Sequence, residues 1–110
     1  MGLFQAIARL IRPEIELSAL ADEIADCTFE AAWQRVNGQI LALAPAEARG
    51  YIRARGAILL QGKTVKVAEQ YGVLSIHRSQ LYALATEALI QRVQVHARML
   101  LTQQTARRAA

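Results

Sequence analysis

Side chains able to hydrogen-bond to base edges are concentrated between residues 75 and 82. Arg78 can donate two hydrogen bonds to the O6 and N7 atoms of guanine, and Gln80 can pair in the same two-point way with N6 and N7 of adenine. Ser79 can bond to a base or to a phosphate. This run predicts a surface that reads double-stranded DNA, with base contacts from Arg78, Ser79, Gln80, His77 and Tyr82.

A second set of side chains is predicted to contact the phosphate backbone. Lysine, arginine, hydroxyl groups and helix N-termini are the protein groups that bind phosphate oxygens. Such groups stand shortly before the base-reading run or at its start. The predicted phosphate contacts are Lys63, Thr64, Lys66, Ser75, Arg53 and Arg55.

Charge is distributed unevenly along the chain. Residues 1–48 carry three basic and seven acidic side chains, a net charge of −4, whereas residues 49–110 carry ten basic and two acidic ones, a net charge of +8. Such asymmetry indicates a polyanionic partner for the second half. A solvated basic face would produce the same pattern, so charge alone leaves both interpretations open.

The elements that would position these side chains form a helix-turn-helix at about residues 64–90. Thr64 is expected to cap a short helix over 65–71, with Ala68 as the small residue at the helix crossing and Gly72 as the left-handed residue after it. Val73 or Leu74 would fill the core, and Ser75 would cap a helix that runs to about residue 105. The turn must absorb two or three more residues than the most compact form of this motif.

The rest of the chain also has helical periodicity, so the predicted fold is all-α: a helical bundle that contains the helix-turn-helix and has a long C-terminal helix. Further helices are expected over 3–11, 19–26 (capped by Ser18), 29–43 (capped by Thr28) and from Pro45 to about Leu60, where Gly62 would stop the helix. The first of these could pack on the protein body or lie on a membrane surface. A weaker second helix-turn-helix candidate spans residues 20–36 but is acidic.

The last helix raises the question of what covers its far half. About 30 helical residues span about 45 Å, whereas a compact domain of this size has a radius of gyration near 13 Å. Residues 1–43 could fold back on it, or a second subunit could cover it, and we expect a homodimer with contacts from Leu89, Val93, His96 and Leu100. The predicted organisation is a packing or dimerisation segment (1–43), a DNA-binding region (45–90) and a dimerising extension (91–110).

Several other classes of protein do not fit the sequence. The single cysteine, Cys27, rules out a disulfide framework, and with only His77 and His96 besides we expect no metal and no cofactor. No apolar run approaches the length of about 18 residues that a membrane span needs, and the apolar part of residues 1–13 is short for a secretory signal. No phosphate-binding glycine loop or nucleophile motif is present, so we expect no enzyme, and a cytoplasmic, nucleoid-associated location.

The run ARGAILLQGKTVKVAEQYGVLSIHRSQLYALATEAL, from Ala54 to Leu89, resembles the helix-turn-helix of plasmid KorA/TrfB-type transcriptional repressors. The shared pattern is Ala-Arg before an aliphatic run, Gly-Lys, an Ala at the centre of the next helix and a Gly before the turn. FEAAW (29–33) resembles the family's first helix. The resemblance implies a dimeric repressor that binds palindromic operators, with DNA contacts from Lys63 and residues 78–83. Because Tyr82 and Ala83 stand where the family has Ser-Gln, its base readout is not carried over.

Together these features predict a sequence-specific DNA-binding transcriptional regulator, most simply a repressor of the plasmid or mobile-element type, that reads its operator through the major groove as a dimer. The alternative is a helical protein-interaction module in which Lys66, Arg78 and Gln80 only keep the surface soluble. A different role on DNA, such as part of a sigma-like factor, an antitoxin or a phage regulator, is a third interpretation.

Overall fold

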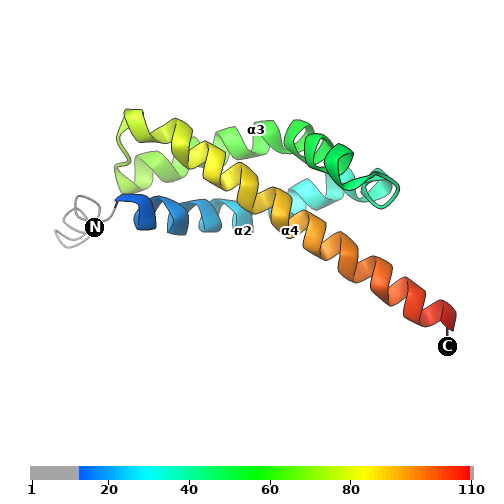
Figure 1. The fold of residues 1–110 in the computed structure, drawn as a ribbon. Coiled ribbons are helices and arrows are strands. Elements are labelled where there is room, and N and C mark those ends of the chain that lie inside the picture. The colour runs from blue at the N-terminus through cyan, green and yellow to red at the C-terminus, as the bar shows by residue number, and fades with distance from the viewer. Residues whose placement is uncertain (1–12, 110) are drawn as a thin grey trace.

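The structure, a computed structural model, describes residues 13–109, and the side chains of residues 17–109. Three helices account for nearly all of them: α2 (Pro13–Ile40), α3 (Pro45–Tyr71) and α4 (Ser75–Ala109) (Figure 1). No strand occurs in this part of the chain. The all-α prediction is therefore confirmed, while the helix expected over residues 3–11 lies outside the described residues.

Helix α2 is one continuous helix where the sequence predicted two. Ser18 and Thr28, both expected to cap helices, lie inside it, and Thr28 is buried with its hydroxyl donating to the Ile24 carbonyl at 2.8 Å. A threonine that bonds back to the preceding turn in this way is compatible with a helix interior. The helix also continues through Asn37 and Gly38 to Ile40. Its continuity excludes the second helix-turn-helix candidate at residues 20–36, because no turn is present there.

Helix α3 starts at Pro45, as the sequence predicted, and ends eleven residues later than expected. Pro45 is its first residue, and the Glu47 carboxylate accepts a hydrogen bond from the Ala44 backbone N–H at 3.4 Å, which satisfies a donor at the helix start. The helix does not stop at Gly62. It runs on to Tyr71, so the expected division into helices 45–60 and 65–71 is wrong, and Thr64 caps nothing.

A three-residue turn, Gly72–Leu74, joins α3 to α4. Gly72 is left-handed (φ 66°, ψ 35°), and the N–H of Val73 bonds to the Ala68 carbonyl at 2.8 Å, which closes the end of α3 as a glycine in this position commonly does. Val73 is buried and Leu74 is exposed, so Val73 is the residue that fills the core. Ser75 and Ile76 already belong to α4, so the extra residues lengthen the helix and not the turn.

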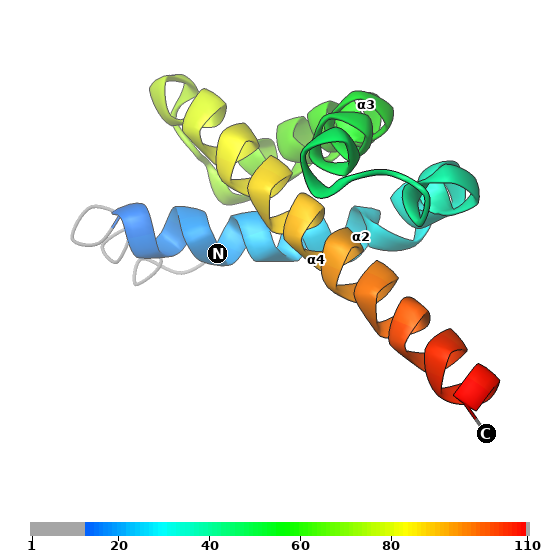
Figure 2. The same ribbon diagram turned by 45° about the vertical axis from the view of Figure 1, so that its right-hand side comes forward.

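Each helix packs against the other two, and α4 crosses the pair formed by α2 and α3 (Figures 1 and 2). The centre of the core consists of aliphatic side chains from all three helices, with no more than 1% of their surface exposed: Ile24, Val36, Ile52, Leu60, Leu81, Leu89 and Ile90, joined by Val67 and Val93 at 2% or less. Burying a side chain of this kind contributes about 1.5–3 kcal/mol. The core is therefore built within one chain.

This core corrects two predicted dimer contacts. Leu89 and Val93 have no exposed surface, because α2 and α3 fold over the first two-thirds of α4, and they are not available to a second subunit. His96 is also occupied within the chain. Its ring packs edge-on against Trp33 and Phe29 of α2, with ring centroids 4.6 and 5.5 Å apart.

The far end of α4 is not covered by the other residues that the structure describes. Both ribbon views show it extending past the ends of α2 and α3 (Figures 1 and 2), and every residue from Leu101 to Ala109 is exposed. The Cα radius of gyration is 16.4 Å, against about 13 Å for a compact chain of this length. The boundary drawn at residues 90 and 91 falls inside α4 and marks no break in the helix.

Candidate nucleic-acid interface

The residues predicted to read bases lie on the first two turns of α4, next to the α3–α4 turn. Ser79 and Gln80 are exposed, and His77 is partly exposed. They stand at the positive end of the helix dipole, where an anion is favoured. The structure thus brings three of the five predicted base-contacting side chains together at one end of the molecule, with their polar groups accessible.

The side chains of the other two predicted base contacts, Arg78 and Tyr82, are less accessible. Arg78 is only partly exposed, and its Nε is buried with no hydrogen-bond partner in the described part of the chain. Tyr82 packs its ring against the hydrophobic core, and its carbonyl accepts a hydrogen bond from the Thr86 hydroxyl at 2.8 Å. Tyr82 is therefore held mainly by the core.

Among the predicted phosphate contacts, Lys66 and Ser75 are exposed and Lys63 is partly exposed. Thr64 is wrong as a phosphate contact, because only 4% of its surface is accessible and it faces the core from the middle of α3. Its hydroxyl has no hydrogen-bond partner among the described residues. The capping role assumed for Thr64 required an exposed helix start, which α3 does not have at that point.

Arg53 lies further along α3 and is engaged by Glu87 of α4. The Glu87 carboxylate lies 2.8 Å from the guanidinium of Arg49 and 3.5 Å from that of Arg53. The hydrogen bond from Arg49, followed by the positive charges of both arginines, holds the pKa of Glu87 below its ordinary value of 4.5. A phosphate would have to compete with this carboxylate for Arg53. Arg55 instead lies over the ring of Tyr51, 5.3 Å from its centroid.

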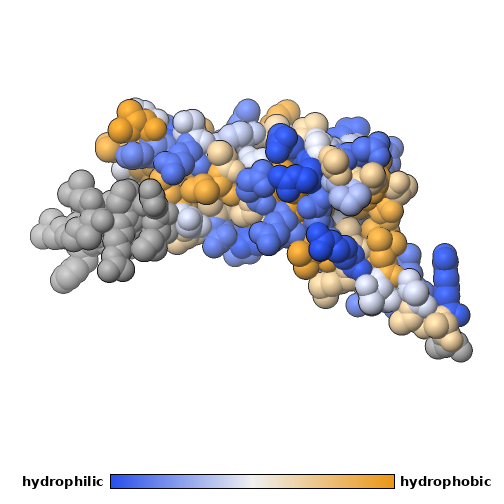
Figure 3. Space-filling view, viewed as in Figure 1, coloured by the Kyte–Doolittle hydropathy of each residue, from blue (hydrophilic) through white to orange (hydrophobic). Residues whose placement is uncertain are grey.

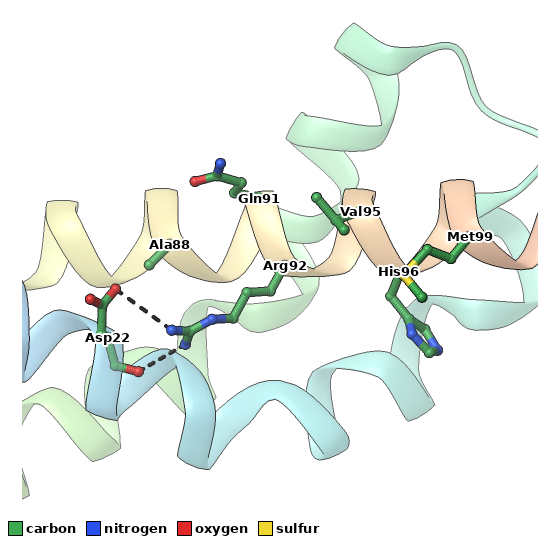
Figure 4. A pocket seen from close by; sticks show the side chains of 7 residues that line it. All are labelled: Asp22, Ala88, Gln91, Arg92, Val95, His96 and Met99. Atoms are coloured by element: carbon green, nitrogen blue, oxygen red, sulfur yellow. Dashed lines mark hydrogen bonds and ion pairs between the residues drawn. The ribbon is translucent and has the colours of Figure 1, made fainter.

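A third basic residue of the second half is also paired with a carboxylate. Arg92 of α4 donates to the Asp22 backbone carbonyl at 2.8 Å, and its guanidinium lies 3.6 Å from Asp22 Oδ1 (Figure 4). The guanidinium also lies 3.1 Å from Asp26 Oδ1. The acidic face of α2 thus neutralises a cation 70 positions away in the sequence. The sequence showed that residues 20–36 are acidic but did not indicate this pairing.

The ion pairs divide the cations of the second half into two groups. None of the ion pairs formed by the described residues involves Lys63, Lys66 or Arg78, the three cations nearest the α3–α4 turn. Between Ala48 and Thr86 the sequence holds six basic residues and one acidic residue, Glu69. The three cations nearest the α3–α4 turn, beside the predicted base contacts, are therefore not offset by a carboxylate among the described residues, and neither are Arg98, Arg107 and Arg108 at the far end of α4.

Two exposed aliphatic side chains at this end were not predicted to be functional. Ile76 is 75% exposed and Leu74 is 62% exposed. In the space-filling view a hydrophobic patch lies beside hydrophilic surface at the end of the molecule where α3 turns into α4 (Figure 3). Apolar groups can contact the C5-methyl group of thymine in the major groove, so the exposed side chain of Ile76 would suit such a contact if this end of the molecule met DNA. Its position beside the turn, among polar residues, was the available sequence signal.

Other kinds of site find little support in the part of the chain that the structure describes. Its histidines, cysteine and carboxylates form no group of three or more that could hold a metal ion. None of its helices combines the length and the apolar character that crossing a membrane requires.

In the part of the chain that the structure describes, three helices form a bundle with a basic, partly apolar end at the α3–α4 turn, and the C-terminal end of α4 projects from it. No protein-family model, curated protein or solved structure matches the chain. Its own residues must therefore carry any assignment of function.

Proposed function

We propose that this protein is a sequence-specific DNA-binding regulator that places the start of α4 in the major groove. In this proposal α3 and α4 act as the two helices of a helix-turn-helix, each longer than the motif requires. Ser79 and Gln80 contact base edges, Ile76 contacts a thymine methyl group, and Lys66 and Ser75 contact phosphates. The resemblance of residues 54–89 to plasmid repressors supports repression as the outcome of binding.

The observation that carries the proposal is the separation of free from neutralised cations. Arg49, Arg53 and Arg92 are matched by carboxylates, whereas Lys66 is exposed without an ion pair among the described residues and lies near the base-reading side chains. Phosphate neutralisation supplies a large share of the affinity of DNA-binding proteins, so a cation that no carboxylate offsets, beside side chains that can reach base edges, supports a DNA surface at this end. The three-residue turn with its left-handed glycine is also the kind of connection that this motif uses.

A helical protein-interaction module is the second candidate, and the exposed aliphatic side chains favour it. Ile58 is 76% exposed, and Val65 lies two turns further along the same side of α3, near the same end as Leu74 and Ile76. Apolar surface of this kind marks contact sites for proteins as well as for DNA. The two functions differ in their salt dependence, because helix packing releases no counterions.

The test is selection of duplexes from a random pool, followed by fluorescence anisotropy titrations of the selected and an unrelated duplex at two salt concentrations. Gln80→Ala is expected to cost about 1–3 kcal/mol on the selected duplex and nothing on the unrelated one, because a base contact is lost. Lys66→Ala is expected to weaken binding to both duplexes equally and to reduce the salt slope by about 1.

Gln39→Ala is the matched control for Gln80→Ala, since Gln39 is an exposed glutamine near the end of α2 and away from the α3–α4 turn. It should bind like the wild type. If no duplex is enriched, or if Gln80→Ala and Lys66→Ala bind as tightly as Gln39→Ala, the proposed interface is wrong. Binding of a protein partner that is insensitive to salt would then favour the interaction module.

A further inference from the structure

Two apolar side chains at the α3–α4 turn are not covered by any residue that the structure describes. Leu74 is 62% exposed and Ile76 is 75% exposed, although Val73 next to them is buried. The space-filling view shows a hydrophobic patch at this end of the molecule (Figure 3). Apolar side chains that are exposed close to one another mark a contact site, whereas single ones are common on any surface.

Helix α2 begins at this same end of the bundle. Ser18, near its start, lines a groove together with Leu84 of α4. Further along both helices, Phe29 packs against His96, with ring centroids 5.5 Å apart. Contacts thus advance in the same direction along α2 and α4, so the two helices run parallel and their starts lie at one end (Figures 1 and 2). The segment that precedes Pro13 is therefore attached at the end that exposes the apolar patch.

The sequence of that segment is amphipathic. On a helix over residues 3–11, Gln5 and Arg9 fall on one side, and five apolar residues share the other. These are Leu3, Phe4, Ile7, Leu10 and Ile11. A nine-residue helix is about 14 Å long and is too short to be stable alone in water. Its apolar side needs a surface to pack against.

We propose that residues 3–11 form a helix whose apolar side covers Leu74 and Ile76. The connection through Arg12 to α2 holds this segment within a few residues of the patch. A short tether of this kind gives an effective concentration in the range of about a millimolar, which a separate chain reaches only at the same bulk concentration. The proposal therefore assigns the cover of the patch to the chain itself and not to a second copy or another protein.

The docking can be tested without DNA, by measuring the reactivity of a thiol at residue 74 in the full chain. Cys27, which is exposed, is replaced by alanine, and Leu74→Cys is labelled with a maleimide. Adding Ile7→Asp places a charge on the apolar side of the segment and is expected to speed this labelling about tenfold, because the patch is uncovered. Gln5→Asp adds the same charge to the opposite side and should leave the rate unchanged.

Met99→Cys is the matched reporter at the other end of α4. Met99 is also an exposed apolar residue, at 55%, and it lies 25 positions beyond Leu74. Its labelling rate should be the same with and without Ile7→Asp. Circular dichroism of each variant checks that the helices remain folded.

A double-mutant cycle supplies the second measurement. Ile7→Ala and Ile76→Ala are each expected to lower the urea midpoint, and the double variant should lose less than the sum, because both changes weaken one contact. If Ile76 were uncovered in the full chain, Ile76→Ala would leave the midpoint unchanged or raise it, since alanine is the better helix former.

Two results would overturn the docking. One is an equal labelling rate of Leu74→Cys with Ile7→Asp and with Gln5→Asp. The other is a protection of Leu74→Cys that grows with protein concentration, because a second copy would then be the cover.

One consequence rests on the proposed function. Ile76 belongs to the proposed DNA surface, so the docked segment and DNA would use the same side chain, and only the undocked fraction of the protein would bind DNA. Ile7→Asp is therefore expected to bind the selected duplex several-fold more tightly than Gln5→Asp, which has the same net charge. Equal affinities would contradict this competition. A chain that binds no duplex would remove the proposed function and leave the labelling result as it stands, so the two proposals can fail separately.

Discussion

The first half of α4, up to Ala97, and the second half, from Arg98 on, have different surroundings. From Leu81 to Ala97 the helix contributes seven buried residues to a core shared with α2 and α3. Beyond Leu100 no residue is buried. The first half also has its cation Arg92 paired by two aspartates of α2, whereas Arg98, Arg107 and Arg108 take part in none of the ion pairs among the described residues.

The difference shows that a helix acquires its role from its neighbours as much as from its own sequence. The last part of α4 projects away from α2 and α3 (Figure 1), and all of its residues from 101 to 109 are exposed among the described residues. Leu89 in the first half is a core residue, whereas Leu101 in the second half is 42% exposed. Stability measurements can test this division directly.

The largest expected effect comes from shortening a leucine in each half. Leu89→Ala should lower the free energy of unfolding by about 2–5 kcal/mol, because Leu89 is fully buried at the crossing of the helices. Leu101→Ala should change it by about 0.5 kcal/mol or less, since Leu101 is 42% exposed. Urea denaturation at one protein concentration measures both. Equal losses would mean that the second half is covered as well as the first.

A smaller effect is expected from two glycines of α3. A Cβ at Gly56 would lie 3.2 Å from Cδ2 of Leu89, whereas a Cβ at Gly62 would meet no atom within 4 Å. Alanine is favoured over glycine inside a helix by about 1 kcal/mol, and overpacking a core costs about 1–3 kcal/mol. Gly62→Ala should therefore stabilise the protein, and Gly56→Ala should destabilise it because fully buried Leu89 has little room to move.

The same denaturation measurement compares the two glycine variants, each of which serves as the control for the other. Gly62→Ala also tests whether α3 is continuous at this point. A loss of stability in Gly62→Ala would indicate that a glycine is required there, as the sequence suggested, and would contradict a helix that passes through residue 62.

Much of the helix content and some helix ends could be predicted from local chemistry. Pro45 and Gly72 act through their own backbone constraints, and both ends of α3 agree with those expectations. Thr28 and Gly62 were misleading because a cap or a breaker contributes only about 1 kcal/mol. Packing on both sides of Gly62, through Leu60 and Val67, outweighs a penalty of that size.

The candidate site shows the same limit. The exposure of Ser79, Gln80 and Lys66 follows from helical periodicity around Leu81 and Val67, and so it could be predicted. The burial of Leu89 and Val93 could not, because it depends on where α2 lies.

A local sequence pattern could not predict the ion pairs between residues that are far apart in the sequence either. Arg49 and Glu87 are separated by 38 residues, and only the crossing of α3 and α4 brings them together. The sequence indicated the sign of the charge in each half but not which cations are neutralised.

The smallest expected effect concerns that neutralisation at Glu87. Its pKa is lowered in the folded protein, chiefly by the hydrogen bond from Arg49, so its contribution to stability is present above pH 4.5 and is lost as the pH falls through the lower folded value. The side chain is 54% exposed, and ion pairs at such positions contribute about 0–1 kcal/mol.

Glu87→Gln should therefore lower the unfolding free energy slightly at pH 7, and its stability should approach that of the wild type as the pH falls below 4. Glu30→Gln is the control, because Glu30 lies on α2 and does not pair with Arg49 or Arg53. A difference between Glu87→Gln and wild type that stays constant from pH 7 to pH 3 would mean that the glutamate acts through packing and not through its charge.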